Sequence, residues 1–299
     1  MHTRPYRPSD FDAAFAVIDL ANRVNQTWRE NPDQLRQQLA DSSDLFGCIL
    51  VEGEQNTLVG VITWQRTGTD YYIDGWVHPK HNGTGVGTAL LRAMEHEVRK
   101  RFKRASISTR TLANIPGVES LFTGEGYHIV RRFYVMTTSL IGRTFDVPLP
   151  SGISIRPVSP DHLEALVSAD NEIFADHWGW HALPIEEWTR RYIVDRPHDP
   201  ALWVIAWDEF GIVGECLGHA SLVGGLQDGW LAVVGVRQAW RGCGLGGAVL
   251  ARGFQRLQQG GYVTASLSVD TENPPAIGLY HKFGMEIART RLNFQKIIR

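Results

Sequence analysis

The residues with the clearest chemical potential form a glycine-rich turn in the second half of the chain. The turn runs from Arg241 to Gly246, reads RGCGLG, and separates an apolar run at 231–236 from an amphipathic segment at 245–259. Three glycines within five residues, placed where a helix should begin, leave several backbone N–H groups unpaired and directed outward. The turn therefore predicts a cradle for a pyrophosphate group.

The elements that position this turn occur twice. Strands are predicted at 71–77 and 230–236, and each leads through a glycine turn into a helix, at 86–102 and 245–259. The turn glycines Gly85 and Gly244 are 159 residues apart, and the glycines that open the last strand of each half, Gly126 and Gly284, are 158 apart. So regular a spacing indicates a tandem duplication.

The duplication defines the expected domains of this α/β chain. Residues 141–152 are rich in proline and glycine towards their end and have no helical periodicity, which predicts a linker. The expected domains are therefore residues 1–140 and 153–299, each of ordinary size.

Composition excludes several classes of protein. The 299 residues are 43% hydrophobic and carry a net charge of -2, which gives no general attraction to nucleic acid or to an anionic membrane. Three distant cysteines indicate neither a disulfide framework nor a metal site. No stretch approaches the ~18 apolar residues of a membrane span, so we expect a soluble protein. The cysteine pattern fits the reducing cytoplasm, and we expect no metal.

Two further residues, in order after the turn, identify a resemblance. Arg241 to Gly246 matches the pattern Arg/Gln-x-x-Gly-x-Gly/Ala, and Asn273 and Tyr280 follow it at the expected places. Together they resemble the GNAT (GCN5-related N-acetyltransferase) family. The resemblance implies two tandem domains, each with a mostly antiparallel twisted sheet that is splayed between its fourth and fifth strands and flanked by helices.

The resemblance also implies acetyl-CoA as co-substrate. The turn would hold the pyrophosphate, Asn273 would contact the pantetheine arm, and Tyr280 would protonate the departing thiolate, a step that suits a phenol with a pKa near 10. The implied contacts are Val234, Val236, Arg241, Gly242, Cys243, Gly244, Leu245, Gly246, Asn273 and Tyr280.

The first half matches the same pattern less well. Asn82 stands where the family has Arg or Gln, and Phe122 stands where Tyr280 lies in the second half. A phenyl ring cannot donate a proton, so we expect this half to keep the fold without catalysing transfer. This arrangement resembles the mycothiol synthase group. A second, weaker cofactor site would use Val77, Asn82, Gly83, Gly85 and Gly87.

The acceptor side is less defined, because 230–236 contains no carboxylate where many family members carry a Glu. Three groups in 171–181 could serve as the base, namely Glu172, Asp176 and His177, with the two acids on one face if the helix continues that far. Trp178 and Trp230 could contact the acceptor. The alternative for 171–181 is a polar helix end with tryptophans packed into the core.

The sequence thus predicts an N-acetyltransferase that acts on a small primary amine by direct transfer in a ternary complex, with its chemistry in the second half. Two alternatives are a peptide or protein N-acetyltransferase and a non-catalytic acyl-CoA-binding sensor. The expected assembly is a monomer or homodimer.

Overall fold

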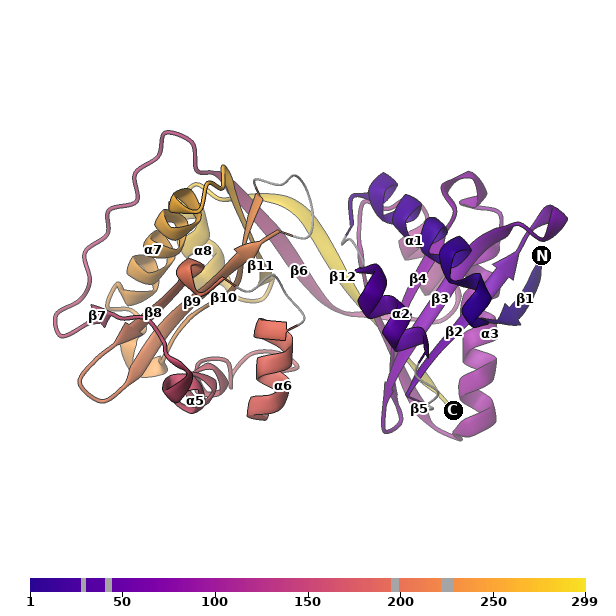
Figure 1. Ribbon diagram of the computed structural model, residues 1–299, viewed down its shortest axis with the longest axis horizontal. Helices are drawn as coiled ribbons and strands as arrows, with labels where there is room; N and C mark the ends of the chain where they lie inside the picture. The colour runs from indigo at the N-terminus through magenta and orange to yellow at the C-terminus, as the bar shows by residue number, and fades with distance from the viewer. Residues whose placement is uncertain (28–30, 41–44, 195–198, 222–227) are drawn as a thin grey trace. The chain divides into compact units, whose positions relative to one another are not determined.

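The computed structural model describes residues 1–27, 31–40, 45–194, 199–221 and 228–299. The chain folds into two units (Figure 1). Unit 1 consists of Met1–Tyr134 and Arg289–Arg299, and unit 2 of Val135–Ala288.

Unit 1 has a mixed sheet in the order β1-β2-β3-β4-β5-β12, in which β4 and β5 pair in parallel and the other neighbouring strands pair antiparallel. Its elements are β1 (His2–Pro5), α1 (Phe11–Asn25), α2 (Pro32–Ala40), β2 (Phe46–Glu52), β3 (Leu58–Thr67), β4 (Asp70–Val77), α3 (Val86–Arg101), β5 (Ala105–Leu112), α4 (Val118–Gly124), the first part of β6 (His128–Ser139) and most of β12 (Glu286–Ile298).

Helices cover both faces of this sheet. On one face, Leu90 and Met94 of α3 pack in a cluster with Ile73 and Ile107 of the central strands. On the other face, α1 and α2 pack over β2 and β3, with Ile18 buried in that cluster. Alternate residues along each strand therefore meet different helices.

Unit 2 repeats this plan in the order β7-β8-β9-β10-β11-β6, with β10 and β11 parallel. Its elements are the second part of β6, β7 (Ser154–Ile155), α5 (Leu163–Ile173), α6 (Ile185–Thr189), β8 (Trp203–Trp207), β9 (Ile212–Ala220), β10 (Asp228–Val236), α7 (Leu245–Gln259), β11 (Thr264–Asp270) and α8 (Pro274–Lys282). The helices predicted after the two glycine turns are confirmed as α3 and α7.

The last strand of each half belongs to the sheet of the other unit. β12 pairs with β5 over Arg291–Ile298, and β6 lies next to β11, with Thr137 bonded to Ala265 and Ser266. The units therefore divide the chain differently from the expected domains 1–140 and 153–299. The copies carry the same strand pattern, so the sequence does not specify which sheet each last strand joins.

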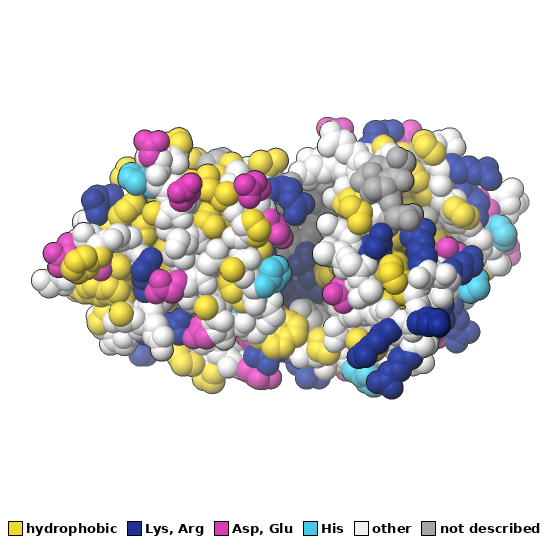
Figure 2. Space-filling view, turned by 90° about the horizontal axis from the view of Figure 1, so that it is seen from below, with side chains coloured by type: hydrophobic (Ala, Val, Ile, Leu, Met, Phe, Trp, Pro, Cys, Tyr) yellow, Lys and Arg dark blue, Asp and Glu magenta, His cyan; other side chains and the backbone are white. Residues whose placement is uncertain are grey.

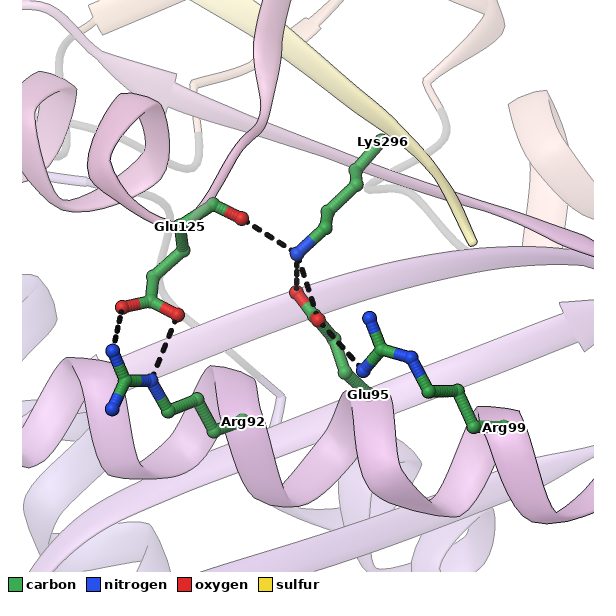
Figure 3. Close-up of polar contacts among 5 residues, drawn as sticks. All are labelled: Arg92, Glu95, Arg99, Glu125 and Lys296. Atoms are coloured by element: carbon green, nitrogen blue, oxygen red, sulfur yellow. Dashed lines mark hydrogen bonds and ion pairs between the residues drawn. The ribbon is translucent and has the colours of Figure 1, made fainter. Parts of the chain in front are cut away.

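A buried ion pair holds β12 in unit 1 (Figure 3). The Lys296 ammonium donates to both carboxylate oxygens of Glu95 at 2.7 Å and to the carbonyl oxygen of Glu125 at 2.6 Å. Glu95 is only 3% exposed and also accepts from Arg99 at 3.1 Å. The first half of the chain thus buries a carboxylate whose main cation comes from the last strand.

Residues 141–152, the predicted linker, contain no helix or strand but are held against α7. Phe145 is buried and its ring lies 4.8 Å from that of Phe254. Side chains of α7 bind the carbonyl groups of this segment, with Arg252 donating to Val147 at 2.9 Å and Gln258 donating to Arg143 at 2.9 Å. The segment is part of unit 2.

The two units differ in charge. Unit 1 contains 20 Lys and Arg against 15 Asp and Glu, whereas unit 2 contains 10 against 17. Figure 2 shows dark-blue basic side chains gathered on the unit 1 side of the visible face. The near-neutral total therefore conceals a basic unit and an acidic one. Within the described residues, no helix is long and apolar enough to cross a membrane.

Replacing Lys296 by Met should destabilise unit 1, because it leaves the buried Glu95 carboxylate with only the half-exposed Arg99. Removing one partner of a buried pair typically costs about 3–5 kcal/mol. Arg92→Met is the matched control, because the Arg92 side chain is 70% exposed in its pair with Glu125, so its removal should cost much less stability. Urea unfolding measures both, and equal losses would contradict the role of Lys296.

Candidate active site

The glycine turn of unit 2 lies between β10 and α7. Gly242 and Gly244 have φ angles of 80° and 91°, in the left-handed region where a side chain brings strain. A Cβ at either glycine would meet no atom within 4 Å. The first N–H groups of α7, which begins at Leu245, have no acceptor within the helix. The turn is thus open on its outer side and has the geometry in which backbone N–H groups can hold a phosphate.

Beside this turn, β10 separates from β11. The parallel register joins Asp228–Leu231 to Thr264–Leu267 and then stops, although β10 continues to Val236 and β11 to Asp270. Val234 and Val236 therefore lie on the part of β10 beyond this pairing. The opening between the strands can receive an extended ligand that runs from the turn into the sheet.

A β-bulge lies where the strands begin to separate. Leu231 is opposite Gly218 and Val233 is opposite Leu217 of β9, so Ala232 is an extra residue in β10. Such a bulge disrupts the ladder locally and re-aims backbone groups. The corresponding strand of unit 1, β4, pairs with β3 without interruption over its whole length. The two copies therefore differ at the strand that borders the opening.

Asn273 directly precedes α8, and Tyr280 lies within it. The Asn273 side chain accepts from the N–H of Ala276 at 3.2 Å and so caps the N-terminus of the helix. Tyr280 is 6% exposed, and burial raises the pKa of its hydroxyl above the ordinary value. The phenol therefore keeps its proton at neutral pH, as a proton donor must.

Two arginines connect the end of α5 to the segment around the turn. Arg241 forms a two-pronged ion pair with Asp176, at 2.5 and 3.2 Å, and donates to the carbonyl oxygen of Ile173 at 2.9 Å. Arg237 lies 3.1 Å from Glu172. The Arg241 guanidinium holds the pKa of Asp176 below its usual range. Both acids proposed as bases are thus engaged by arginine side chains.

The condition for a common helical face of Glu172 and Asp176 is not met, because α5 ends at Ile173. Beyond that end the chain turns, with the N–H of His177 donating to the carbonyl oxygen of Phe174 at 2.9 Å. No strong stop signal marks this point in the sequence, since the next glycine is Gly179.

His177 has a different environment from the two acids. Burial lowers the pKa of its imidazole, which the nearby charges of Asp176 and Asp270 partly oppose. Because Asp270 ends β11, His177 lies near the mouth of the opening between the strands. A largely neutral imidazole at pH 7 can accept a proton.

The two tryptophans predicted to contact the acceptor differ in exposure. Trp178 is 45% exposed and follows His177 directly. Trp230 is 7% exposed and lies in the paired part of β10, opposite His219 and Ser266. The Trp230 ring is therefore covered mainly by protein atoms, whereas Trp178 is accessible.

Two buried carboxyl groups beside this site were not identified from the sequence. Asp170 on α5 and Glu215 on β9 are both fully buried, and Asp170 accepts from the indole N–H of Trp188 at 3.1 Å. Burial raises the pKa of both groups; the neighbouring Asp170 raises that of Glu215 further, whereas a hydrogen bond with Glu215 partly opposes the rise at Asp170. Folding therefore favours the protonated form of the pair. The position of Glu215 within the apolar run 212–217 could have indicated that this carboxyl is buried.

The corresponding parts of unit 1 have the turn but no tyrosine at the position of Tyr280. Gly83 and Gly85 are also left-handed, at 75° and 88°, and α3 begins directly afterwards. Phe122 is buried and its ring stacks on Phe294 of β12 at 4.9 Å. Asn82 occupies the position of Arg241. The site of the phenol is thus filled by packed aromatic rings.

Comparison with known proteins places these features in one family. The model of the acetyltransferase (GNAT) family matches residues 15–118 and again 163–285. Mycothiol acetyltransferase of Streptomyces coelicolor is 31% identical over 96% of this chain and 92% of its own length. The enzyme of the same name from Streptomyces avermitilis is 29% identical with the same coverage.

Solved structures agree with the fold. A GCN5-related N-acetyltransferase from Sphaerobacter thermophilus is 25% identical with a TM-score of 0.76, covering all of this chain and 96% of its own. A tandem GNAT protein from the clavulanic acid biosynthesis pathway has the same TM-score at 14% identity, with 98% of its chain covered. Both span the full tandem arrangement.

Glu215→Gln should flatten the pH dependence of stability. Because folding raises the pKa of the Asp170–Glu215 pair, the folded protein binds more protons than the unfolded chain above about pH 4.5. The contribution of the pair to the free energy of unfolding is fully present at lower pH and is lost as the pH rises through the raised pKa of the folded state. A tenfold gain in the proton affinity of one carboxyl on folding corresponds to about 1.4 kcal/mol in the free energy of unfolding. The variant removes this pH-dependent contribution.

Urea unfolding at about pH 5 and about pH 8 measures this effect. Glu209→Gln, at an exposed turn, is the control and should follow the parent protein. The interpretation fails if the Glu215 variant loses as much stability between the two pH values as the parent.

Proposed function

The chain belongs to the GNAT acetyltransferase family, and from this premise we propose that it transfers the acetyl group of acetyl-CoA to the primary amine of a small molecule, with the chemistry in unit 2. The observation that carries the proposal is the difference between the two copies. Tyr280 is a buried, protonated phenol in unit 2, whereas Phe122 takes its place in unit 1.

The described residues of unit 2 fit acetyl-CoA. The left-handed glycines Gly242 and Gly244 and the first N–H groups of α7 would hold the pyrophosphate. Val234 and Val236 would pair through their backbone with the pantetheine arm, because they lie beyond the pairing with β11. Bound there, acetyl-CoA supplies an acetyl group activated as a thioester.

In the proposed reaction, the neutral acceptor amine attacks the thioester carbonyl directly, so that a C–N bond forms and the C–S bond breaks. Holding the reactants together supplies much of the rate. A backbone N–H near the bulge at Ala232 would stabilise the negative charge that develops on the carbonyl oxygen. Tyr280 would give its proton to the departing sulfur.

For the base we propose His177, directly or through a water molecule. Its lowered pKa leaves it neutral at pH 7, and it lies near the end of β11. We assign Asp176 and Glu172 a positioning role instead, because their carboxylates bind Arg241 and Arg237. Trp178, adjacent and accessible, would contact the acceptor.

A small-molecule acceptor is supported by the relatives that share nearly the whole chain, which are named mycothiol acetyltransferases. The amine precursor of mycothiol is therefore the first acceptor to test. Because 230–236 of β10 contains no carboxylate, a panel of other small amines should accompany it.

Tyr280→Phe should lower kcat by about 10²-fold or more, because it removes only the hydroxyl that protonates the leaving thiolate. Acetyl-CoA affinity should change little. Thiol release on the amine panel measures the rate, and Tyr262→Phe, after the end of α7, is the control. Full activity of the Tyr280 variant would remove the basis for the proposed donor.

Gly244→Ala should weaken acetyl-CoA binding at least tenfold, because a non-glycine residue in the left-handed region costs about 1–2 kcal/mol and the turn would shift to relieve it. Gly261→Ala is the matched control, since Gly261 has φ of 84° and an equally open Cβ position at the other end of α7.

Titration of these variants with acetyl-CoA in a calorimeter also shows whether the chain has one acetyl-CoA site or two. If unit 1 also binds acetyl-CoA, Gly85→Ala should remove the second binding event and leave the first. Equal binding by the Gly244 and Gly261 variants would count against the turn as the pyrophosphate site.

A further inference from the structure

Unit 1 carries a group of polar side chains on one face of its sheet that the proposed reaction does not use. On β4, β5 and β12, the residues of the opposite face are apolar and pack under α3; they include Tyr71, Ile73, Ile107, Leu292 and Phe294. The alternate residues of the same strands are polar: Tyr72, Asp74, Arg110, Arg291 and Asn293. We call these five residues the polar face.

The strand register brings these residues together. Asn293 lies directly opposite Arg110 across the β12–β5 pair, and Arg291 is two residues further along β12. Tyr72 forms the last β4–β5 pair, after which the strands separate. Asp74 and Arg110 therefore lie beyond that point, on the two sides of the opening, and the Arg110 guanidinium is 5.5 Å from the Tyr72 ring.

Three buried polar atoms of this group lack a hydrogen-bond partner among the described residues. They are the hydroxyl of Tyr72, Nε of Arg291 and the side-chain oxygen Oδ1 of Asn293. Each unpaired buried group typically costs about 1–3 kcal/mol. Two of these atoms can donate and one can only accept, so a complementary ligand offers two acceptor oxygens and one donor.

The charge of Arg291 is not neutralised within the described part of the chain. Its guanidinium lies 4.5 Å from the centre of the Phe133 ring, and no carboxylate of the described residues is among the groups that shift its pKa. Burial, and then repulsion from Arg110, lowers the pKa of Arg291 to about 10. Water could satisfy its N–H groups but not balance its charge, whereas an anion could do both.

We propose that the polar face binds a small α-hydroxy or α-amino carboxylate. The carboxylate would accept from Arg291 Nε and from the Tyr72 hydroxyl, and the hydroxyl or ammonium group on the next carbon would donate to Asn293 Oδ1. Asp74, on the same face and near enough to Arg110 to interact with it, adds carboxyl oxygens that can accept from an ammonium group. The excess of basic residues in unit 1 would favour the approach of an anion.

This site is independent of the acetyl transfer proposed for unit 2, because all five residues belong to unit 1. The sequence gives little indication of the polar face. Tyr72 and Asp74 alternate with apolar residues as in any half-exposed strand, and the other residues come from strands that lie far along the chain.

Titration calorimetry of the full chain, at constant ionic strength, tests the proposal with L-malate, L-aspartate, succinate and inorganic phosphate. The first three share one carbon skeleton and differ only in the hydroxyl, ammonium or hydrogen at the second carbon. Malate or aspartate should bind tighter than succinate. Arg291→Met should weaken that binding at least tenfold, and Asn293→Leu should abolish the preference over succinate.

Arg289→Met is the matched control, because Arg289 lies on the same strand but binds the backbone and side chain of Gln26. It should bind malate and aspartate as the parent does. Should Arg291→Met not fold, Tyr72→Phe gives the second test, with an expected loss of binding. No binding of either ligand, equal binding of phosphate, or binding unaffected by both Arg291→Met and Tyr72→Phe would overturn the proposal.

Discussion

The arrangement of the site in unit 2 depends on the guanidinium of Arg241. It binds the Asp176 carboxylate with two nitrogens and also the carbonyl oxygen of Ile173, the last residue of α5. A planar guanidinium can form this forked contact, and a lysine could not. One side chain therefore fixes the end of α5 against the segment that precedes the glycine turn. The segment that carries His177 and Trp178 begins from that fixed point.

The two copies of the fold differ in this arrangement. Unit 1 keeps left-handed glycines and the helix that follows them, because the sheet and α3 require that connection. It has Asn82 at the place of Arg241 and no bulge in β4. Phe122, at the position of Tyr280, stacks on Phe294 and contributes to the core. Unit 1 has polar side chains at the point where β4 and β5 separate.

Local patterns predicted most of this fold. The turns, α3, α7 and the strands before them follow from glycine spacing and apolar periodicity, which act over a few residues. The partners of the last strands, the early end of α5 and the Asp170–Glu215 pair depend on contacts between distant segments. In particular, Asp170 and Glu215 lie 45 residues apart, and neither position alone indicates that two acids meet in the core.

The exchange of the last strands has a consequence for how the protein is made. Unit 2 is continuous in sequence from Val135 to Ala288, so all of it leaves the ribosome before the segment that follows it. Unit 1 needs Arg289–Arg299 for the strand beside β5 and for the cation that pairs with Glu95. The N-terminal unit therefore completes its fold last, and until that segment emerges the edge of β5 is exposed to chaperones and to other nascent chains.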